Sequence, residues 1–277
     1  MKGGVSMNSS DFRTEARNKL SGKWTKAALI TVVYFAVFFV LSFIENAFSE
    51  NLSGLFSLIQ LIIEVPLSFG FVISLVKLYN SEEVSALDVI TSGYHNFAKS
   101  WGITWNIVKK MILPVVLIIV SVFVIIGGFV ASSVSFLGAG SDFNVTKLLA
   151  SASGVAIVGI ILYIVGCIWL IIKSYYYSLS YVIAAHDSSL TAKDAVEKSQ
   201  ELMQGKRWKL FVLQLSFIGW AILGAITMGI GFIFIMPYIQ FATIAFYNYI
   251  SGNQSNVNSE PSDVEPITNN DDTSSSL

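Results

Sequence analysis

Residues Thr191 to Tyr249 decide the fold, and their sequence is TAKDAVEKSQELMQGKRWKLFVLQLSFIGWAILGAITMGIGFIFIMPYIQFATIAFYNY. It opens with Thr191 three residues before Asp194, a spacing typical of a capped helix N-terminus. Small and apolar side chains then share one helical face, and the helix is predicted to end near Gly205. From Leu210 to Ile250 there is no charged side chain. As a helix this run would be roughly 60 Å long, about twice the hydrocarbon thickness of a bilayer.

Gly229 and Gly231 lie near the middle of that charge-free run, where a tight turn would divide it into two spans. The stretch is therefore predicted to contain an amphipathic helix, a basic and aromatic group of residues, and a membrane hairpin. This unit identifies a membrane protein and leaves its activity open.

The composition agrees with a membrane location. Hydrophobic residues make up 54% of the 277 residues and charged residues 13%, about half the usual share of charge in a soluble domain. The mean hydropathy is +0.66. A net charge of -1 gives no support to nucleic-acid binding. A single cysteine and two histidines indicate neither a disulfide nor a metal centre, and no cofactor is expected.

The expected fold is all-α, with six transmembrane helices arranged as three hairpins, each preceded by a cytoplasmic amphipathic helix at the membrane interface. Residues 1–26 form the amphipathic N-terminal segment, in which Phe12, Ala16 and Leu20 are spaced at four. The membrane domain covers 27–250, and residues 251–277 read as a disordered, acidic and polar tail. The predicted spans are 27–44, 55–78, 111–130, 155–172, 210–228 and 231–250. Glu64 and Pro66 are expected to interrupt the second span, and residues 131–153 read as a small, polar connection.

Lysine and arginine residues alternate strongly between the loops. Sixteen of the 17 lie in the N-terminal segment, the loop between spans two and three, or the loop between spans four and five, and only Lys147 lies on the opposite side. By the positive-inside rule this distribution places both termini in the cytoplasm. The expected location is the plasma membrane, as a multi-pass protein.

A short basic and aromatic motif occurs three times, each time ahead of a predicted hairpin: Gly22-Lys23-Trp24, Lys99-Ser100-Trp101 and Gly205-Lys206-Arg207-Trp208. Capping boxes precede the second and third copies, at Ser85–Asp88 and Thr191–Asp194, whereas the first copy lacks a clear one. Either the chain contains a threefold repeat, or a membrane flank has simply attracted Lys and Trp. The candidate anchors for lipid headgroups are Lys23, Trp24, Lys99, Trp101, Lys206, Arg207, Trp208 and Lys209. The alternative is an ordinary positive-inside signal.

Polar side chains also share one face of the second span: Ser57, Gln60, Glu64 and Ser68. A carboxylate in the middle of a bilayer costs on the order of 3 kcal/mol on insertion scales, so Glu64 needs a compensating partner. One hypothesis is a polar site for a substrate, ion or proton. The other is a structural role, in which a protonated Glu64 bonds to a residue such as Gln214 or Gln240.

The sequence contains no phosphate-binding loop, dinucleotide fingerprint or His-Glu metal motif. His186-Asp187-Ser188-Ser189 does not predict a nucleophile and base, because adjacent residues cannot generally form a triad. The protein is therefore expected not to be an enzyme. Small residues at Ala221, Ala225 and Gly229, with Gly224 nearby, and at Gly159 and Gly166, are typical of helix packing in membranes.

Several of these stretches together resemble the bacterial integral membrane proteins grouped as domain of unknown function 975. The resemblance is carried by ARNKLSGKW (Ala16 to Trp24), SQELMQGKRWKLF (Ser199 to Phe211) and the segments around Leu215–Trp220, Thr227–Gly231, Pro237-Tyr238 and Phe246-Tyr247. Residues 131–153 match no part of the pattern. The resemblance implies a membrane protein of Gram-positive bacteria and supplies no catalytic residues. The family is also distantly similar to the membrane domain of some glycerophosphodiester phosphodiesterases, which implies a role that involves lipids or the cell envelope.

Three hypotheses follow. The first is a non-enzymatic accessory or scaffold protein whose partners are membrane lipids, with another membrane protein or a second copy of the chain as alternatives and no nucleic acid. The second is a transporter or channel for a small solute or hydrophobic peptide that uses the site around Glu64. The third, a membrane enzyme acting on lipid, rests on the distant similarity alone.

Overall fold

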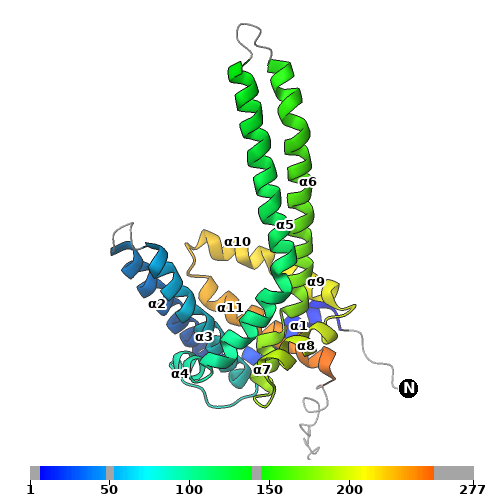
Figure 1. Cartoon of the computed structure of the whole chain (residues 1–277). Helices are drawn as coiled ribbons and strands as arrows, with labels where there is room; N and C mark the ends of the chain where they lie inside the picture. Colours follow the sequence, from blue (N-terminus) through cyan, green and yellow to red (C-terminus); the bar gives the residue numbers. More distant parts are fainter. Residues whose placement is uncertain (1–6, 48–52, 139–144, 253–277) are drawn as a thin grey trace, which may run out of the picture.

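The computed structural model describes residues 7–47, 53–138 and 145–252, and within these ranges the chain is helical and contains no strand (Figure 1). The helices are α1 (Ser9–Leu20), α2 (Trp24–Ala47), α3 (Ser53–Tyr79), α4 (Asp88–His95), α5 (Phe97–Gly138), α6 (Val145–Tyr177), α7 (Ser180–His186), α8 (Ala192–Leu202), α9 (Arg207–Leu215), α10 (Ile218–Ile226) and α11 (Phe232–Ser251). Six stretches are long and apolar enough to cross a membrane: Trp24–Glu45, Gly54–Tyr79, Phe97–Ala131, Gly154–His186, Arg207–Ile226 and Phe232–Ser251. The predictions of an all-α fold and of six apolar stretches of spanning length are confirmed.

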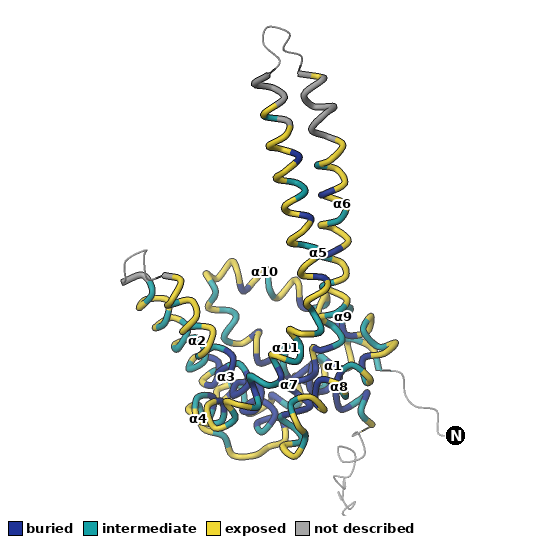
Figure 2. The backbone as a smooth tube through the Cα atoms, in the orientation of Figure 1, coloured by how far each residue is buried: buried dark blue, intermediate teal, exposed yellow. Residues whose placement is uncertain are grey.

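The molecule divides into a base and three arms. The base contains α1, α4, α7 and α8 together with the adjoining ends of α3, α5 and α11, and the buried residues concentrate there (Figure 2). The arms are α2–α3, α5–α6 and α9–α10–α11, of which α5–α6 extends farthest (Figure 1). Large apolar side chains are exposed on the arms, for example Phe39, Phe123 and Phe129, which are 77%, 70% and 70% exposed. Water would not tolerate so much exposed apolar surface, whereas lipid would.

The short helices join the arms in a ring. Each packs on a helix of the preceding arm: α4 on α3, and α8 on α7 and α5. The ring closes because α1, the first helix, packs on α11, the last. Phe12 of α1 lies edge-on to Phe246 and Tyr249 of α11, at ring-centroid distances of 5.4 and 5.5 Å. The residues spaced at four in α1, Phe12, Ala16 and Leu20, are therefore buried against protein.

The short helices that precede the three motifs, α1, α4 and α8, each have an aspartate in the first turn. The Asp194 backbone N–H donates to Thr191 Oγ1 (3.2 Å), which confirms the predicted cap of α8. The Asp88 carboxylate accepts from the backbone N–H of Ser85 (3.1 Å), although α4 begins without a side-chain cap from Ser85. The first copy does have such a contact, from the Asn8 backbone N–H to Asp11 (2.7 Å). Asparagine is as good a cap as serine, so the prediction that this copy lacks a box was wrong. The three aspartates precede their motif lysines by 12, 11 and 12 residues.

Several predicted boundaries were too narrow. α2 starts at Trp24, inside the segment assigned to residues 1–26. α3 runs unbroken through Glu64 and Pro66, because a proline in a membrane helix is tolerated when its neighbours satisfy the freed carbonyl. The third span, 111–130, is the middle of α5, whose 42 residues extend about 63 Å. α5 continues to Gly138 and α6 begins at Val145, so both helices extend into the connection predicted at residues 131–153. The predicted tail beyond residue 252 lies outside the described residues.

The fifth span, predicted as one helix over 210–228, is instead broken at Ser216 and Phe217 into α9 and α10. Ser216 Oγ donates to the Leu213 carbonyl (2.6 Å), and Arg13 Nη1 donates to the Ser216 carbonyl (3.5 Å). These bonds compete with the helical backbone pattern, and serine back-bonding of this kind bends helices. Each half alone is about 14 Å long, less than half the thickness of a bilayer core, so the spanning length of Arg207–Ile226 belongs to the two halves together. The turn predicted at Gly229–Gly231 occupies residues 227–231, with a positive φ of 91° at Gly229.

Candidate functional site

The lysines of the three motifs, Lys23, Lys99 and Lys206, all donate to backbone carbonyls at helix C-termini. Lys23 Nζ donates to the Leu78 carbonyl (3.0 Å) at the end of α3, and also to Ser81 Oγ (2.8 Å). Lys206 Nζ donates to the Ile250 carbonyl (3.4 Å) at the end of α11. A cation is favourable at a helix C-terminus, where the last carbonyls lack intrahelical partners.

Lys99 makes the largest set of these contacts. Its Nζ donates to the carbonyls of Ala184 (3.4 Å), Asp187 (3.4 Å) and Ser188 (3.0 Å), at and just beyond the end of α7. Each of these lysines thus binds carbonyls at the end of a later helix: α3 for Lys23, α7 for Lys99 and α11 for Lys206. We call Lys23, Lys99 and Lys206 the closure lysines. Their shared role supports a threefold repeat, because a membrane flank that had merely attracted positive charge would not aim it at the same place three times.

The candidate headgroup anchors consequently separate into two groups. The closure lysines are hydrogen bonded to the protein itself. Partial burial lowers the pKa of Lys23 from its ordinary value, and the nearby charges of Lys19 and Lys26 lower it further. Trp24 packs against Tyr238 at a centroid distance of 6.1 Å, and Trp101 is half-buried with its Nε1 atom inaccessible. Trp208 is different, because it is 71% exposed. In the third motif, Trp208 faces outward, whereas Arg207 and Lys209 lie over tyrosine rings.

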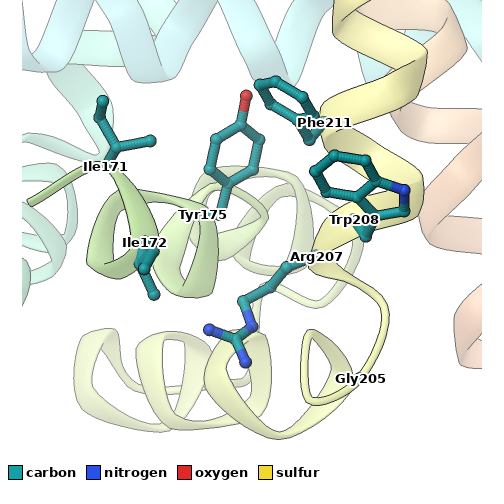
Figure 3. A pocket seen from close by; sticks show the side chains of 7 residues that line it. All are labelled: Ile171, Ile172, Tyr175, Gly205, Arg207, Trp208 and Phe211. Atoms are coloured by element: carbon teal, nitrogen blue, oxygen red, sulfur yellow. The ribbon is translucent and has the colours of Figure 1, made fainter. Parts of the chain in front are cut away.

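A pocket of about 360 Å³ opens between α6 and the start of α9, beside this third motif. Figure 3 shows Trp208 and Phe211 of α9 facing Tyr175, with Ile171 and Ile172 of α6 on the other side and the Arg207 guanidinium below. Trp208 stacks on Phe211 (5.1 Å between centroids), and Tyr175 donates from its hydroxyl to Gln214 Oε1 (2.7 Å). No pattern in the sequence indicates the α6 side of this pocket, because the pairing of α6 with α9 is set by tertiary packing.

Arg207 is the charged group of the pocket. Its guanidinium lies over the ring of Tyr176 at 4.1 Å, a stacking arrangement that leaves the edge of the fork available for hydrogen bonds. Within the described residues no acceptor is bound to that fork. Lys209, two residues on, lies over the ring of Tyr249 at 5.4 Å. The pocket therefore combines apolar walls with one oriented cation, at the end of two candidate spans where tyrosine and tryptophan are typical of the headgroup layer.

Comparison with protein families decides what kind of chain this is. The family model described as "Protein of unknown function (DUF975)" matches residues 7–254. The chain belongs to this family. No curated protein and no solved structure matches it.

In this DUF975 protein the polar face of the second span is not assembled into one site. Ser68 Oγ and the Tyr34 hydroxyl of α2 are hydrogen bonded (3.2 Å), and Ser57 donates to Glu45 (3.3 Å) near the far end of the same arm. Gln60 and Glu64 are half-buried on α3. Gln214, one of the partners considered for Glu64, bonds to Tyr175 instead. Ser57 and Ser68 thus bond within their own arm, α2–α3.

The segment His186–Ser189 has the geometry of a turn. His186 Nδ1 is hydrogen bonded to the Val182 carbonyl (2.9 Å), and Asp187 accepts from both the backbone N–H and the hydroxyl of Ser189. These bonds from Ser189 hold the pKa of Asp187 below its usual range. The histidine and the serine are not bonded to each other. Among the described residues no group of three or more His, Cys, Asp or Glu side chains is placed to hold a metal ion.

Proposed function

We propose that this protein is a non-enzymatic accessory protein of the plasma membrane that binds anionic phospholipid at the Arg207 pocket. The observation that carries the proposal is the position of an oriented guanidinium at the end of an apolar pocket beside an exposed indole. A phosphate would accept from the Arg207 fork, and an acyl chain would lie along Ile171, Ile172 and Phe211. Arginine suits such a site because its planar fork matches phosphate geometry.

The first test of this proposal is lipid retention. Purified protein in nanodiscs containing phosphatidylglycerol and phosphatidylcholine is expected to keep phosphatidylglycerol selectively, measured by native mass spectrometry. Arg207→Gln should reduce that retention about fivefold, since one charge near an anionic surface is worth about 1 kcal/mol. Arg17→Gln is the matched control, because Arg17 is exposed on α1, away from the pocket. Equal retention by both variants, or no preference for the anionic lipid, would exclude this pocket as the lipid site.

The proposed orientation places the base in the cytoplasm and the far ends of the arms outside, with cytoplasmic termini and three membrane hairpins. The basic residues support it, because the closure lysines and the third motif lie in the base, whereas Lys147 lies in the first turn of α6, at the far end of the longest arm. In this arrangement α1, α4 and α8 lie at the cytoplasmic interface with their apolar residues turned toward protein.

Cysteine labelling tests the orientation. With Cys167 replaced by alanine, Lys147→Cys is expected to react with a membrane-impermeant maleimide added to intact cells. Lys193→Cys, on α8, should react only after lysis, because the membrane blocks the reagent. Labelling of both positions from the same side would contradict the proposed orientation.

Transport through the Glu64 face has less support. Ser57 and Ser68 are bonded within the α2–α3 arm, and none of the four residues of that face lines the Arg207 pocket. A separate cavity, of about 700 Å³, lies between α2 and the α10–α11 turn and is lined almost entirely by apolar side chains such as Phe35, Phe39 and Ile230. Its chemistry suits lipid rather than a polar solute.

A further inference from the structure

A second kind of cavity lies in the base, between the end of α3, α4 and the end of α7, with a volume of about 560 Å³. Its walls are mixed. Phe69, Ile73 and Val76 of α3 supply apolar surface, and they are all buried. The rim carries exposed polar residues from three separate segments, among them Asn80, Thr91 and Ser188. The cavity is therefore apolar at its floor and polar at its mouth.

In the proposed orientation, with the base in the cytoplasm, the mouth of the cavity faces water. Asn80 and Glu82 lie just after α3 ends, and Ser188 lies just after α7 ends. α4 and α7 both lie in the base, away from the far ends of the arms (Figure 1). A ligand of this cavity would enter from the water on the base side, so a soluble molecule is favoured over a membrane lipid.

The cavity holds one charge of each sign, and neither is neutralised by protein. Lys77 and Glu82 both line it, and the Glu82 backbone N–H donates to the Lys77 carbonyl (3.0 Å), which keeps the two residues together at the end of α3. In the described part of the chain, the one ion pair within 4.0 Å is Lys193–Glu197, on α8. Lys77 and Glu82 are therefore available to a ligand that carries both charges.

A third polar group at the cavity wall also lacks a partner. His186 lines the cavity, and its Nδ1 atom is held by the Val182 carbonyl. A nitrogen bonded to a carbonyl must be the protonated one, so Nε2 carries the lone pair and is an acceptor. Nε2 is buried and has no hydrogen-bond partner among the described residues. Because Nε2 has no exposed surface, it does not contact a ligand in the cavity, so the charged groups that face such a ligand are Lys77 and Glu82.

We propose that this cavity binds a small zwitterion with an apolar side group, such as an apolar amino acid or a dipeptide. The ligand's carboxylate pairs with Lys77, its ammonium pairs with Glu82, and its side group lies on Phe69, Ile73 and Val76. The site is independent of the Arg207 pocket, because the two share no lining residue. It gives an accessory protein a means of sensing a soluble solute on the base side of the membrane.

The experiment measures binding of L-leucine and L-leucyl-L-leucine to the full chain in nanodiscs by isothermal titration calorimetry. Binding of at least one probe is expected at millimolar concentration or below. Leucinamide, which lacks the carboxylate, and 4-methylpentanoate, which lacks the ammonium, should each bind about 10-fold more weakly, the effect of losing one charged hydrogen bond.

Two charge-neutralising variants locate the site. Lys77→Gln and Glu82→Gln are each expected to weaken binding about 10-fold. Lys193→Gln, which removes a charge outside the cavity, should leave binding unchanged. Thermal unfolding midpoints close to that of the native protein would show that the variants are folded. Absence of binding by both zwitterions, equal binding of the single-charge analogues, or native binding by both cavity variants would overturn the proposal, whatever the result for phosphatidylglycerol at Arg207.

Discussion

Replacing Gly70 with alanine is expected to lower the free energy of unfolding by roughly 3 kcal/mol, at the upper end of the usual cost of overpacking. α3 and α4 cross so closely at this position that a Cβ atom on Gly70 would lie 2.0 Å from the Val89 carbonyl oxygen and 2.7 Å from the Gly93 nitrogen. Both are backbone atoms, so no side-chain rotation can relieve the contact. α4 would have to move away from α3 as a whole.

Gly93→Ala tests the same crossing from the other side and should have a similar effect. A Cβ atom on Gly93 would lie 2.3 Å from the Pro66 carbonyl oxygen. Gly127→Ala is the matched control, because Gly127 lies inside α5 and a Cβ atom there would meet nothing within 4 Å. That variant should be neutral or slightly more stable, since alanine favours a helix over glycine.

The measurement is the thermal unfolding midpoint in detergent, followed together with the yield of monodisperse protein. Gly70→Ala and Gly93→Ala should both show a lower midpoint than Gly127→Ala. If they also lower the affinity for the zwitterionic probe, the loss is explained by displacement of α4, which forms one wall of that cavity. Native stability of Gly70→Ala would mean that the α3–α4 crossing is looser than the structure shows.

Periodic patterns made much of the fold predictable. Long apolar runs located all six candidate spans, including the second, which contains Glu64, because a bilayer demands long apolar segments. The four-residue spacing of Phe12, Ala16 and Leu20 likewise identified the buried face of α1. Gly159 and Gly166 do pack closely on α5, as predicted, since Cβ atoms there would lie 2.6 and 2.8 Å from Ile125 and Ile118.

Single contacts between distant residues were not predictable. Gly70 and Gly93 are isolated in the sequence, and nothing marks them as partners. The predicted small-residue face of Ala221, Ala225 and Gly229 was wrong: Ala225 is exposed and Gly229 lies in a turn, whereas the close approach is between Gly224 and Gly231. The break between α9 and α10 was not predicted either, and the Ser216 carbonyl at that break accepts from Arg13, more than 200 residues earlier.

The same limit applies to the candidate sites. The third basic motif was recognised from its residues, but its pocket depends on α6. The polar cavity of the base was missed because its walls combine the end of α3, with Lys77 and Glu82, with α4 and the end of α7, and no sequence spacing relates these segments. The sequence identified the closure lysines as candidate anchors. It could not identify the groups that they bind, because those groups are backbone carbonyls, which every residue has.

The closure lysines lead to the second large effect. Lys99→Met is expected to lower the free energy of unfolding by about 2 kcal/mol, because charged hydrogen bonds typically contribute about 1.5–3 kcal/mol. Methionine keeps much of the apolar stem and removes the donors, so the loss isolates the bonds to the carbonyls at the end of α7. Lys23→Met should cost a similar amount, since its two bonds are short.

The predicted order of the three variants distinguishes helix closure from lipid anchoring. Lys206 has one long bond, 3.4 Å, so Lys206→Met should be the mildest. Lys26→Met is the control: Lys26 is exposed on α2, one turn after Lys23, and has no hydrogen bond within the described residues. If these lysines acted on headgroups, the loss would grow with the anionic lipid content of the nanodisc, and Lys26→Met would cost as much as Lys23→Met. If they close the arms, the loss persists in neutral detergent and Lys26→Met has almost no effect, because only a bond within the protein is independent of the surrounding lipid.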